Sequence, residues 1–215
     1  KKMLKKIVDY LSIKKRKHLF KKDSYSFGGV DLLIDYLFKD FKKGIYVDVG
    51  AQHPISNNNT FLLFKRGWCG VNIDLDKENI NLFNISRPKD FNFNYAISSQ
   101  EGKKKLFFYH KKSPINTLDE QVSQNNKAKV NEIKEINTIT LDKVLSFTNY
   151  KKINFLNIDV EGHELDVLRG FNLEKYKPEV IIVEFLDLKM KKLELKNNEL
   201  NNVLNSDLYK FLTNK

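Results

Sequence analysis

IYVDVG, residues 45–50, is the stretch that decides the fold: a short apolar run with one acidic residue, which stops at a glycine. Similar apolar runs predict further strands at residues 70–74, 153–160 and 180–185, and alternation of apolar and polar residues predicts another at 91–97. Between them lie segments that predict helices, at residues 57–66, 77–85, 140–146 and 163–169. Strands that alternate with helices form parallel sheets covered on both faces. We therefore predict an α/β fold with a Rossmann-like, doubly wound and mostly parallel sheet.

Segments outside this alternation predict additions to the sheet. Residues 103–110 (KKKLFFYH) are expected to form an added edge strand. The polar, Asn- and Gln-rich stretch 113–135 is expected to form either a lid or a short helix in an insertion. Residues 1–22 and 29–42 have apolar side chains at helical spacing. We therefore divide the chain into an N-terminal helical, basic extension (1–43) and a Rossmann-like domain (44–215).

The charge distribution bears on possible partners. The formal net charge of +11 suggests binding to nucleic acid or to an anionic membrane, because basic side chains attract phosphate groups. Ten of the first 22 residues are Lys or Arg and only Asp9 is acidic, so most of the excess lies in one terminal segment. We therefore expect no nucleic-acid partner. Residues 1–22 either pack on the main domain or rest on an anionic membrane as a peripheral contact.

Composition favours a globular protein of a reducing compartment. Hydrophobic residues make up 41% and charged residues 30%, which argues against a disordered chain. The single cysteine, Cys69, excludes an intramolecular disulfide framework and a Cys-rich zinc site. The sequence has no apolar run long enough to cross a bilayer and no signal-peptide core. We expect the protein to be cytoplasmic.

Two acidic residues at successive strand ends indicate a nucleoside site. Asp48 precedes Gly50 at the end of the first strand, and Asp74 ends the second strand. Ligands of doubly wound sheets bind outside these ends, where a carboxylate accepts the hydroxyl protons of a ribose. The sequence lacks both the G-x-G-x-x-G and the P-loop patterns that cradle phosphates. A nucleoside without phosphates therefore fits best.

A third cluster of ionisable residues follows the strand at 153–160. The segment reads Asp159-Val160-Glu161-Gly162-His163-Glu164, so that several ionisable groups meet in one cleft. Glu164 has a structural explanation, because a carboxylate in the first turn of a helix interacts favourably with the helix dipole. For Asp159 we favour a functional role, because burying a carboxylate at the end of a strand costs free energy that a purely structural position would not explain.

Five segments occur in order across about 140 residues: DVGAQHP (48–54), SNNNTFLLFKRGWCGVNIDLD (56–76), RPKDFNFNYAIS (87–98), FLNIDVEGHELDVLRG (155–170) and VIIVEF (180–185). Together they resemble the FkbM family of S-adenosylmethionine-dependent methyltransferases. The resemblance implies a class I methyltransferase sheet. It also implies O-methylation of a hydroxyl, often on sugars of bacterial surface glycans or on small natural products.

The resemblance also implies roles for individual residues. Asp48, Gly50 and Ala51 would line the methionine side of the cofactor, and Asp74, followed by Leu75, would hold its ribose. Ala96, Ile97 and Ser98 would approach the adenine, and Asp159 would face the transferred methyl group. The family commonly has a second small residue soon after the first glycine, whereas this chain has Gln52-His53-Pro54.

The reaction needs a group that removes the proton of the acceptor hydroxyl. A histidine or a desolvated carboxylate suits this task, and the candidates are His163, His53 and Asp159. Alternatively, Asp159, Glu161, His163 and Glu184 would bind Mg²⁺, which lowers the pKa of the hydroxyl. A nicotinamide-dependent oxidoreductase and a noncatalytic α/β scaffold with a basic terminus remain alternative functions.

The acceptor is expected to be a small molecule or a glycan, with a nucleotide-sugar or a surface-glycan component as the first choice. The sequence makes no prediction of the oligomeric state. A methyltransferase sheet of this type normally closes with two further strands after residues 180–185, whereas residues 186–215 predict helix. We therefore expect the C-terminal edge strands to be missing, which leaves a sheet edge exposed.

Overall fold

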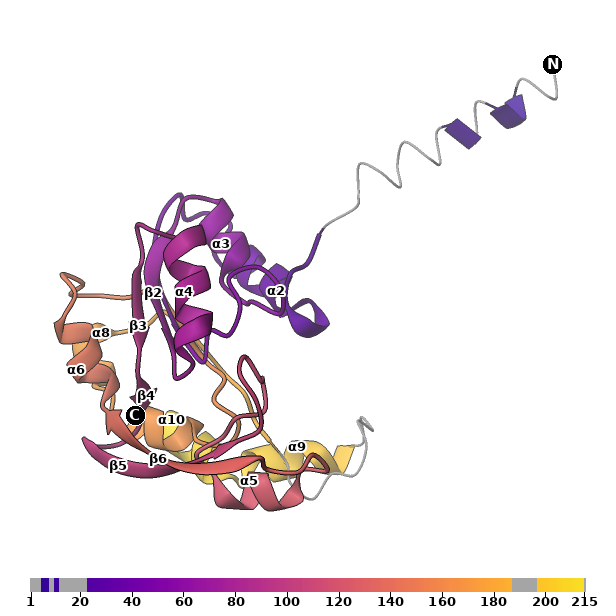
Figure 1. Ribbon diagram of the computed structural model, residues 1–215. Helices are drawn as coiled ribbons and strands as arrows, with labels where there is room; N and C mark the ends of the chain where they lie inside the picture. Colours follow the sequence, from indigo (N-terminus) through magenta and orange to yellow (C-terminus); the bar gives the residue numbers. More distant parts are fainter. Residues whose placement is uncertain (1–4, 8–9, 12–22, 187–196, 215) are drawn as a thin grey trace.

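A computed structural model describes residues 5–7, 10–11, 23–186 and 197–214 (Figure 1). Its main sheet has five parallel strands in the order β3-β2-β1-β7-β8. In chain order these are β1 (Ile45–Val49), β2 (Cys69–Asp74), β3 (Phe91–Asn94), β7 (Phe155–Ile158) and β8 (Val180–Val183). The predicted α/β class and the mostly parallel, Rossmann-like sheet are confirmed.

The strand order creates a switch point beside β1. The chain first builds outward to β2 and β3 through α3 (Phe61–Lys65) and α4 (Lys77–Ser86). It then returns to the opposite side of β1 and adds β7 and β8. Parallel strands that leave a central strand in opposite directions open a crevice at their carboxyl ends, where ligands bind.

Helices cover both faces of the main sheet (Figure 1). On one face, α2 (Val30–Leu37), preceded by the 3-10 helix η1 (Phe27–Gly29), buries Ile34 against Tyr46 and Phe155 together with α3. On the other face, Val47 and Val49 pack against α6 (Leu141–Ser146), α7 (Glu164–Arg169), α8 (Leu173–Tyr176) and α10 (Asp207–Thr213). The helix that we assigned to the N-terminal extension thus shares a core with the sheet.

A second, smaller sheet corrects the prediction for residues 91–139. It contains β4 (Ala96–Ile97), β6 (Glu132–Ile139) and β5 (Gly102–Phe108) in that order. The predicted strand 91–97 is divided at Tyr95, because β4 pairs with β6 instead of continuing in the main sheet. The edge strand at 103–110 exists as β5, and its antiparallel partner β6 was missed. The stretch 113–135 contains the short helix α5 (Glu120–Asn125) and the start of β6.

Several helix predictions differ only at their ends. Thr140 caps α6 as expected, because its Oγ1 accepts a hydrogen bond of 3.2 Å from the Lys143 amide. The helix predicted at 57–66 begins four residues late, because Asn57 has a φ of +51° and the next residues bind the sheet. The described C-terminal residues form α9 (Asn197–Leu204) and α10, in agreement with the helical prediction.

Most of the predicted N-terminal helix at 1–22 lies outside the described residues. The described positions 5–7 and 10–11 are helical. Among the residues that the structure describes, no helix has both the length and the apolar composition needed to cross a bilayer.

Polar residues cross one face of the main sheet in a row. Asn92, Asn72, Asp48 and Asn157 are successive neighbours in the register of β3, β2, β1 and β7. Two pairs in the row hydrogen-bond directly, at 2.8 Å from Asn157 Nδ2 to Asp48 Oδ1 and 2.8 Å from Asn72 Nδ2 to Asn92 Oδ1. Thr60 and Arg87 connect the two pairs. Buried polar groups need such partners, so the row fixes how these strands align.

Arg87 connects this polar row to the loop after β1. Its guanidinium is fully buried and lies over the rings of Tyr46, Phe61, Phe64 and Phe83. It donates to the oxygens of Pro54, Asn58, Thr60, Asn72 and Tyr46, at 2.5–3.3 Å. Arg87 therefore holds the loop at residues 54–60 to the sheet through Pro54, Asn58 and Thr60.

We predict that Arg87→Met destabilises the protein by about 3–5 kcal/mol, because the buried oxygens around the guanidinium lose their donor. Urea unfolding followed by circular dichroism measures this loss. The control is Arg169→Met, since the Arg169 side chain is 54% exposed and its ion pair with Asp166 is worth about 0–1 kcal/mol. Equal effects of the two substitutions would contradict the role assigned to Arg87.

Candidate active site

A first cavity lies at the carboxyl ends of β1, β2 and β7, the position that we predicted for a ligand site. Seven of the predicted site residues line it: Gly50, Asp74, Leu75, Ala96, Ile97, Asp159 and His163. The segment before α5 forms another wall of this cavity through Ser113, Pro114, Asn116 and Leu118. The structure thus brings residues from five separate parts of the chain to one cavity.

Asp74 presents a buried carboxylate to the first cavity. Its Oδ2 accepts a hydrogen bond of 2.8 Å from the Gln52 amide, and its Oδ1 accepts one of 2.7 Å from the Asp76 amide. Burial raises the pKa of Asp74 to about 6, although these hydrogen bonds act in the opposite direction. The carboxylate is ionised at neutral pH and has acceptor capacity left, as binding a ribose requires.

Gly50 allows the backbone of β1 to approach the end of β7. It has a φ of +81°, and a Cβ added there would lie 1.7 Å from the carbonyl oxygen of Asp159. A side chain at this position would therefore separate the two strands that form the floor of the cavity. The loop that follows is fixed by Gly50 and Ala51, whose amides donate to the Ile73 carbonyl at 2.9 and 3.0 Å.

Asp48 and Ala51 lie near the first cavity but do not line it. The Asp48 carboxylate faces the α3 side of the sheet and accepts hydrogen bonds from Asn157, Thr60 and Asn58, at 2.8–3.2 Å. Burial raises its pKa. Because these three donors occupy the carboxylate, its role in the structure is to hold the loop after β1 against β7. Ala51 is buried, and its carbonyl accepts from Asn58.

His53 stabilises its own loop. Its Nδ1 accepts hydrogen bonds from the amides of Ile55 (3.2 Å) and Ser56 (3.0 Å). Burial and the nearby Lys112 lower the pKa of His53, which favours the neutral ring that can accept these bonds. The structure does not bring His53 together with Asp159 and His163 in the first cavity.

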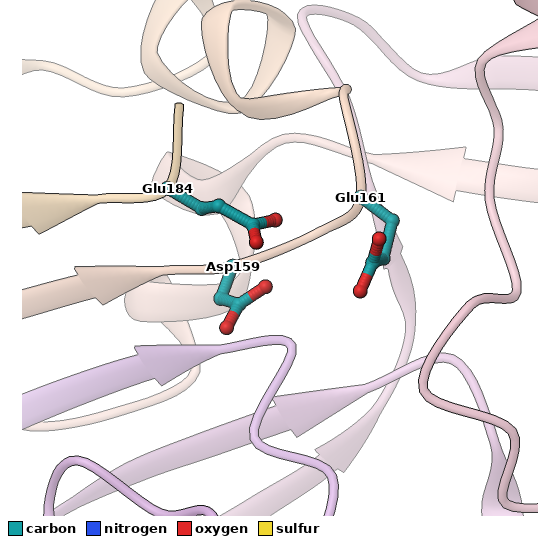
Figure 2. A group of neighbouring side chains, drawn as sticks. All are labelled: Asp159, Glu161 and Glu184. Atoms are coloured by element: carbon teal, nitrogen blue, oxygen red, sulfur yellow. The ribbon is translucent and has the colours of Figure 1, made fainter. Parts of the chain in front are cut away.

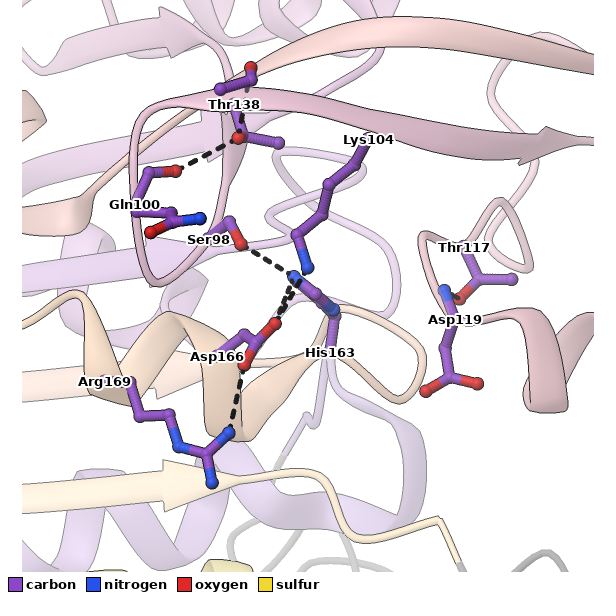
Figure 3. Close-up of polar contacts among 10 residues, drawn as sticks. Ser98, Gln100, Lys104, Thr117, Asp119, Thr138, His163, Asp166 and Arg169 are labelled. Atoms are coloured by element: carbon purple, nitrogen blue, oxygen red, sulfur yellow. Dashed lines mark hydrogen bonds and ion pairs between the residues drawn. The ribbon is translucent and has the colours of Figure 1, made fainter.

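His163 lines the first cavity and belongs to a polar group that joins three elements (Figure 3). Its Nε2 lies 3.0 Å from Ser98 Oγ and 3.3 Å from Asp166 Oδ2, and Asp166 also binds Lys104 at 2.9 Å. Burial and the charge of Lys104 lower the pKa of His163. Ser98, predicted beside the adenine, is fully buried and contacts this histidine instead of lining the cavity.

Asp159, Glu161 and Glu184 form a carboxyl cluster beyond β7 and β8 (Figure 2). One oxygen from each lies within 4.8 Å of the others. Glu184 hydrogen-bonds Asp159, and burial together with the charge of Asp159 raises the pKa of Glu184 to about 9. Burial and the same charge raise the pKa of Glu161 to about 7. His163, the fourth predicted magnesium ligand, is not in this cluster.

A second cavity, of about 360 Å³, lies between the ends of β7 and β8 and the start of α2. It shares four lining residues with the first cavity: Gln52, Asn57, Pro114 and Asp159. Asp159 is the only ionisable residue of these four. Two ligands bound in the two cavities would therefore meet at a carboxyl group.

A comparison with protein families matches the methyltransferase FkbM domain over residues 48–213. Because the match covers most of the chain, the protein belongs to the FkbM methyltransferase family. The family assignment confirms the resemblance and makes the protein a methyltransferase, in place of a nicotinamide-dependent oxidoreductase or a noncatalytic scaffold. The comparisons found no similar protein among those with curated functions and none among the solved structures.

Sequence reasoning missed several residues of the two cavities. Gln52 and Asn57 both have positive φ values, +49° and +51°, which place them at the boundary between the cavities. Asn157 holds Asp48, and as a polar residue inside an apolar strand it was a signal that the sequence already offered. By contrast, no feature of the sequence predicts the positive φ of Gln52.

We predict that Gly50→Ala destabilises the protein by about 1–3 kcal/mol, because the added methyl group overlaps the Asp159 carbonyl oxygen. Urea unfolding gives the size of the effect. Gly102→Ala is the matched control, since a Cβ at Gly102 would meet no atom within 4 Å. If Gly50→Ala were as stable as Gly102→Ala, the close approach of β1 and β7 would be wrong.

Proposed function

We propose that this methyltransferase transfers the methyl group of S-adenosylmethionine to a hydroxyl of a sugar, in a nucleotide-sugar or a surface-glycan component. The observation that carries the proposal is the position of Asp159 at the junction of the two cavities. In this assignment the first cavity binds the cofactor and the second binds the acceptor. The transferred group then passes between them beside a carboxyl group.

The residues of the first cavity fit S-adenosylmethionine. Asp74 offers acceptor oxygens to ribose hydroxyls, and Gly50 lets the ends of β1 and β7 approach each other beneath the cofactor. Ala96 and Ile97 supply an apolar wall suited to the adenine. When bound, the cofactor supplies a methyl group on a positively charged sulfur, which an oxygen nucleophile attacks as the carbon–sulfur bond breaks.

The chain itself must position the acceptor hydroxyl and accept its proton. We assign the base to Asp159, because it lines both cavities, whereas His163 lines only the first and already contacts Ser98 and Asp166. Burial raises the pKa of Asp159, which makes the carboxylate a better base near neutral pH. Glu184 donates a hydrogen bond to it and thereby orients it.

The same carboxyl cluster is also suitable for Mg²⁺, since carboxylate oxygens are the ligands that this ion prefers. A bound cation would lower the pKa of the acceptor hydroxyl. It would also replace the proton through which Glu184 hydrogen-bonds Asp159. This use of the cluster is a second proposal, to be separated from the first by experiment.

We place the reaction in the cytoplasm, on the basis of the single cysteine.

For the cofactor, we predict that Asp74→Asn weakens binding of S-adenosylhomocysteine between about tenfold and a hundredfold, because hydrogen bonds to a charged acceptor are lost. In the native protein the affinity should fall as the pH drops through about 6, since protonation removes the ionised acceptor. Isothermal titration calorimetry at several pH values measures both effects.

Asp40→Asn, in an exposed position of the loop before β1, is the control and should bind as the native protein does. Failure of the native protein to bind S-adenosylhomocysteine would remove the cofactor assignment. Binding of NADH in its place would contradict it as well.

For the base, we predict that Asp159→Asn lowers kcat by about 10²–10⁴, the usual contribution of a general base. In the native protein kcat should rise with pH through a pKa above that of an ordinary aspartate. Glu132→Gln, at an exposed position of β6, is the control. A larger loss in His163→Gln than in Asp159→Asn would assign the base to the histidine.

Chelation separates the two uses of the cluster. With Asp159 as a metal-free base, EDTA leaves the methylation rate unchanged. A rate lost in EDTA and restored by added Mg²⁺ would assign a cation to the cluster.

A further inference from the structure

The walls of the second cavity restrict the acceptor that it can bind. Its outer wall comes from Phe27 and Val30, at the start of η1 and α2, and its inner wall from Ile182 and Val183 of β8. These side chains give the cavity two apolar surfaces. A volume of about 360 Å³ is in the range of small-ligand sites, so it accommodates a single small ring or a pair of them.

Amide groups form the polar part of the same cavity. Gln52, Asn57, Asn59 and Asn157 line it, and each amide carries both donors and an acceptor. Asn59 Nδ2 donates to Asn157 Oδ1 at 2.9 Å, so the two amides are held in a fixed orientation. Hydroxyl groups also both donate and accept, and a row of amides therefore suits a ligand with several hydroxyls.

The charges of the cavity disfavour an anion. The ionisable side chains that line it are the carboxyl groups of Asp159 and Glu184, and the lining residues, all in the described part of the chain, include no lysine or arginine. A phosphate group placed there would meet carboxyl groups without a compensating cation. The basic residues that give the sequence its net positive charge are therefore not among the residues that line this cavity.

Phe27 is the exposed member of the cavity wall. Its side chain is 80% exposed, although it lies beside a cavity that would shelter it if a ligand were bound. An aromatic face pairs well with an apolar surface of similar size, such as the C–H face of a pyranose ring. An exposed phenylalanine at the mouth of an amide-lined cavity thus offers a platform for a sugar ring.

From these observations we propose that the second cavity is a subsite for an uncharged pyranose ring, which stacks on Phe27 and hydrogen-bonds the amide row. The ring presents one hydroxyl to Asp159. This inference rests on the proposed methyltransferase function, which it deepens by naming the site and the charge of the acceptor ring. A glycoside and the sugar part of a nucleotide-sugar share this chemistry, since the diphosphate of the latter would lie outside the cavity.

The test measures binding directly, with methyl β-D-glucopyranoside and methyl α-L-rhamnopyranoside as probes. Saturation-transfer difference NMR is recorded on the full chain loaded with S-adenosylhomocysteine. We expect at least one glycoside to bind, and glucose 1-phosphate to bind more weakly than the methyl glucoside. UDP-glucose and dTDP-rhamnose form a parallel arm, in which binding through the sugar protons identifies a nucleotide-sugar as the source of the ring.

Phe27→Ala should weaken glycoside binding by roughly tenfold, the factor that about 1.4 kcal/mol represents, and leave the affinity for S-adenosylhomocysteine unchanged. Ile85→Ala is the matched control, because Ile85 is equally exposed at 80% and lies on α4. Tighter binding of glucose 1-phosphate, unaltered binding in Phe27→Ala, or no binding of either glycoside to the loaded protein would overturn the inference. Failure to bind S-adenosylhomocysteine would instead overturn the proposed function.

Discussion

The buried guanidinium of Arg87 is the interaction on which the architecture of the site depends. It reaches Asn72 on β2, Tyr46 on β1 and the loop after β1, and so connects the polar row of the sheet to the residues that precede α3. A charge without solvent is tolerated only when many acceptors surround it, and here five oxygens and four rings do so. Because this contact fixes the loop at 54–60, it also fixes Asn57 and Asn59, which line the second cavity.

Much of the main sheet could be predicted because four of its strands are short apolar runs that stop at a glycine or an acid, and β3 shows the alternation typical of a strand. The division of residues 91–97 between two sheets could not be predicted. Phe91 to Asn94 pair with β2 in the main sheet. Ala96 and Ile97 pair instead with β6, a strand rich in Glu, Lys and Asn that lies about forty residues later in the chain. The apolar pattern near Tyr95 carries no information about so distant a partner, since such pairings are decided by tertiary packing.

The candidate site was predicted in part. Asp74, Gly50 and Asp159 reach the cavity because the carboxyl ends of neighbouring parallel strands must meet at one edge. Asp48 does not reach it, and alternation along β1 explains why. Its neighbours Val47 and Val49 face the α6 side, so Asp48 must face the α3 side, where Asn58, Thr60 and Asn157 occupy it. Both faces are covered by helices, and alternation alone does not show which of them opens to a ligand.

The outer wall of the second cavity lies ahead of the region that matches the family domain. Phe27 and Val30 precede residue 48, where the match to the family domain begins. The region that carries family membership is thus not the whole of the region that lines the second cavity. Under the acceptor assignment proposed above, a short segment ahead of the family domain takes part in selecting the acceptor. Exchange of that segment would then alter selectivity while leaving the cofactor cavity unchanged.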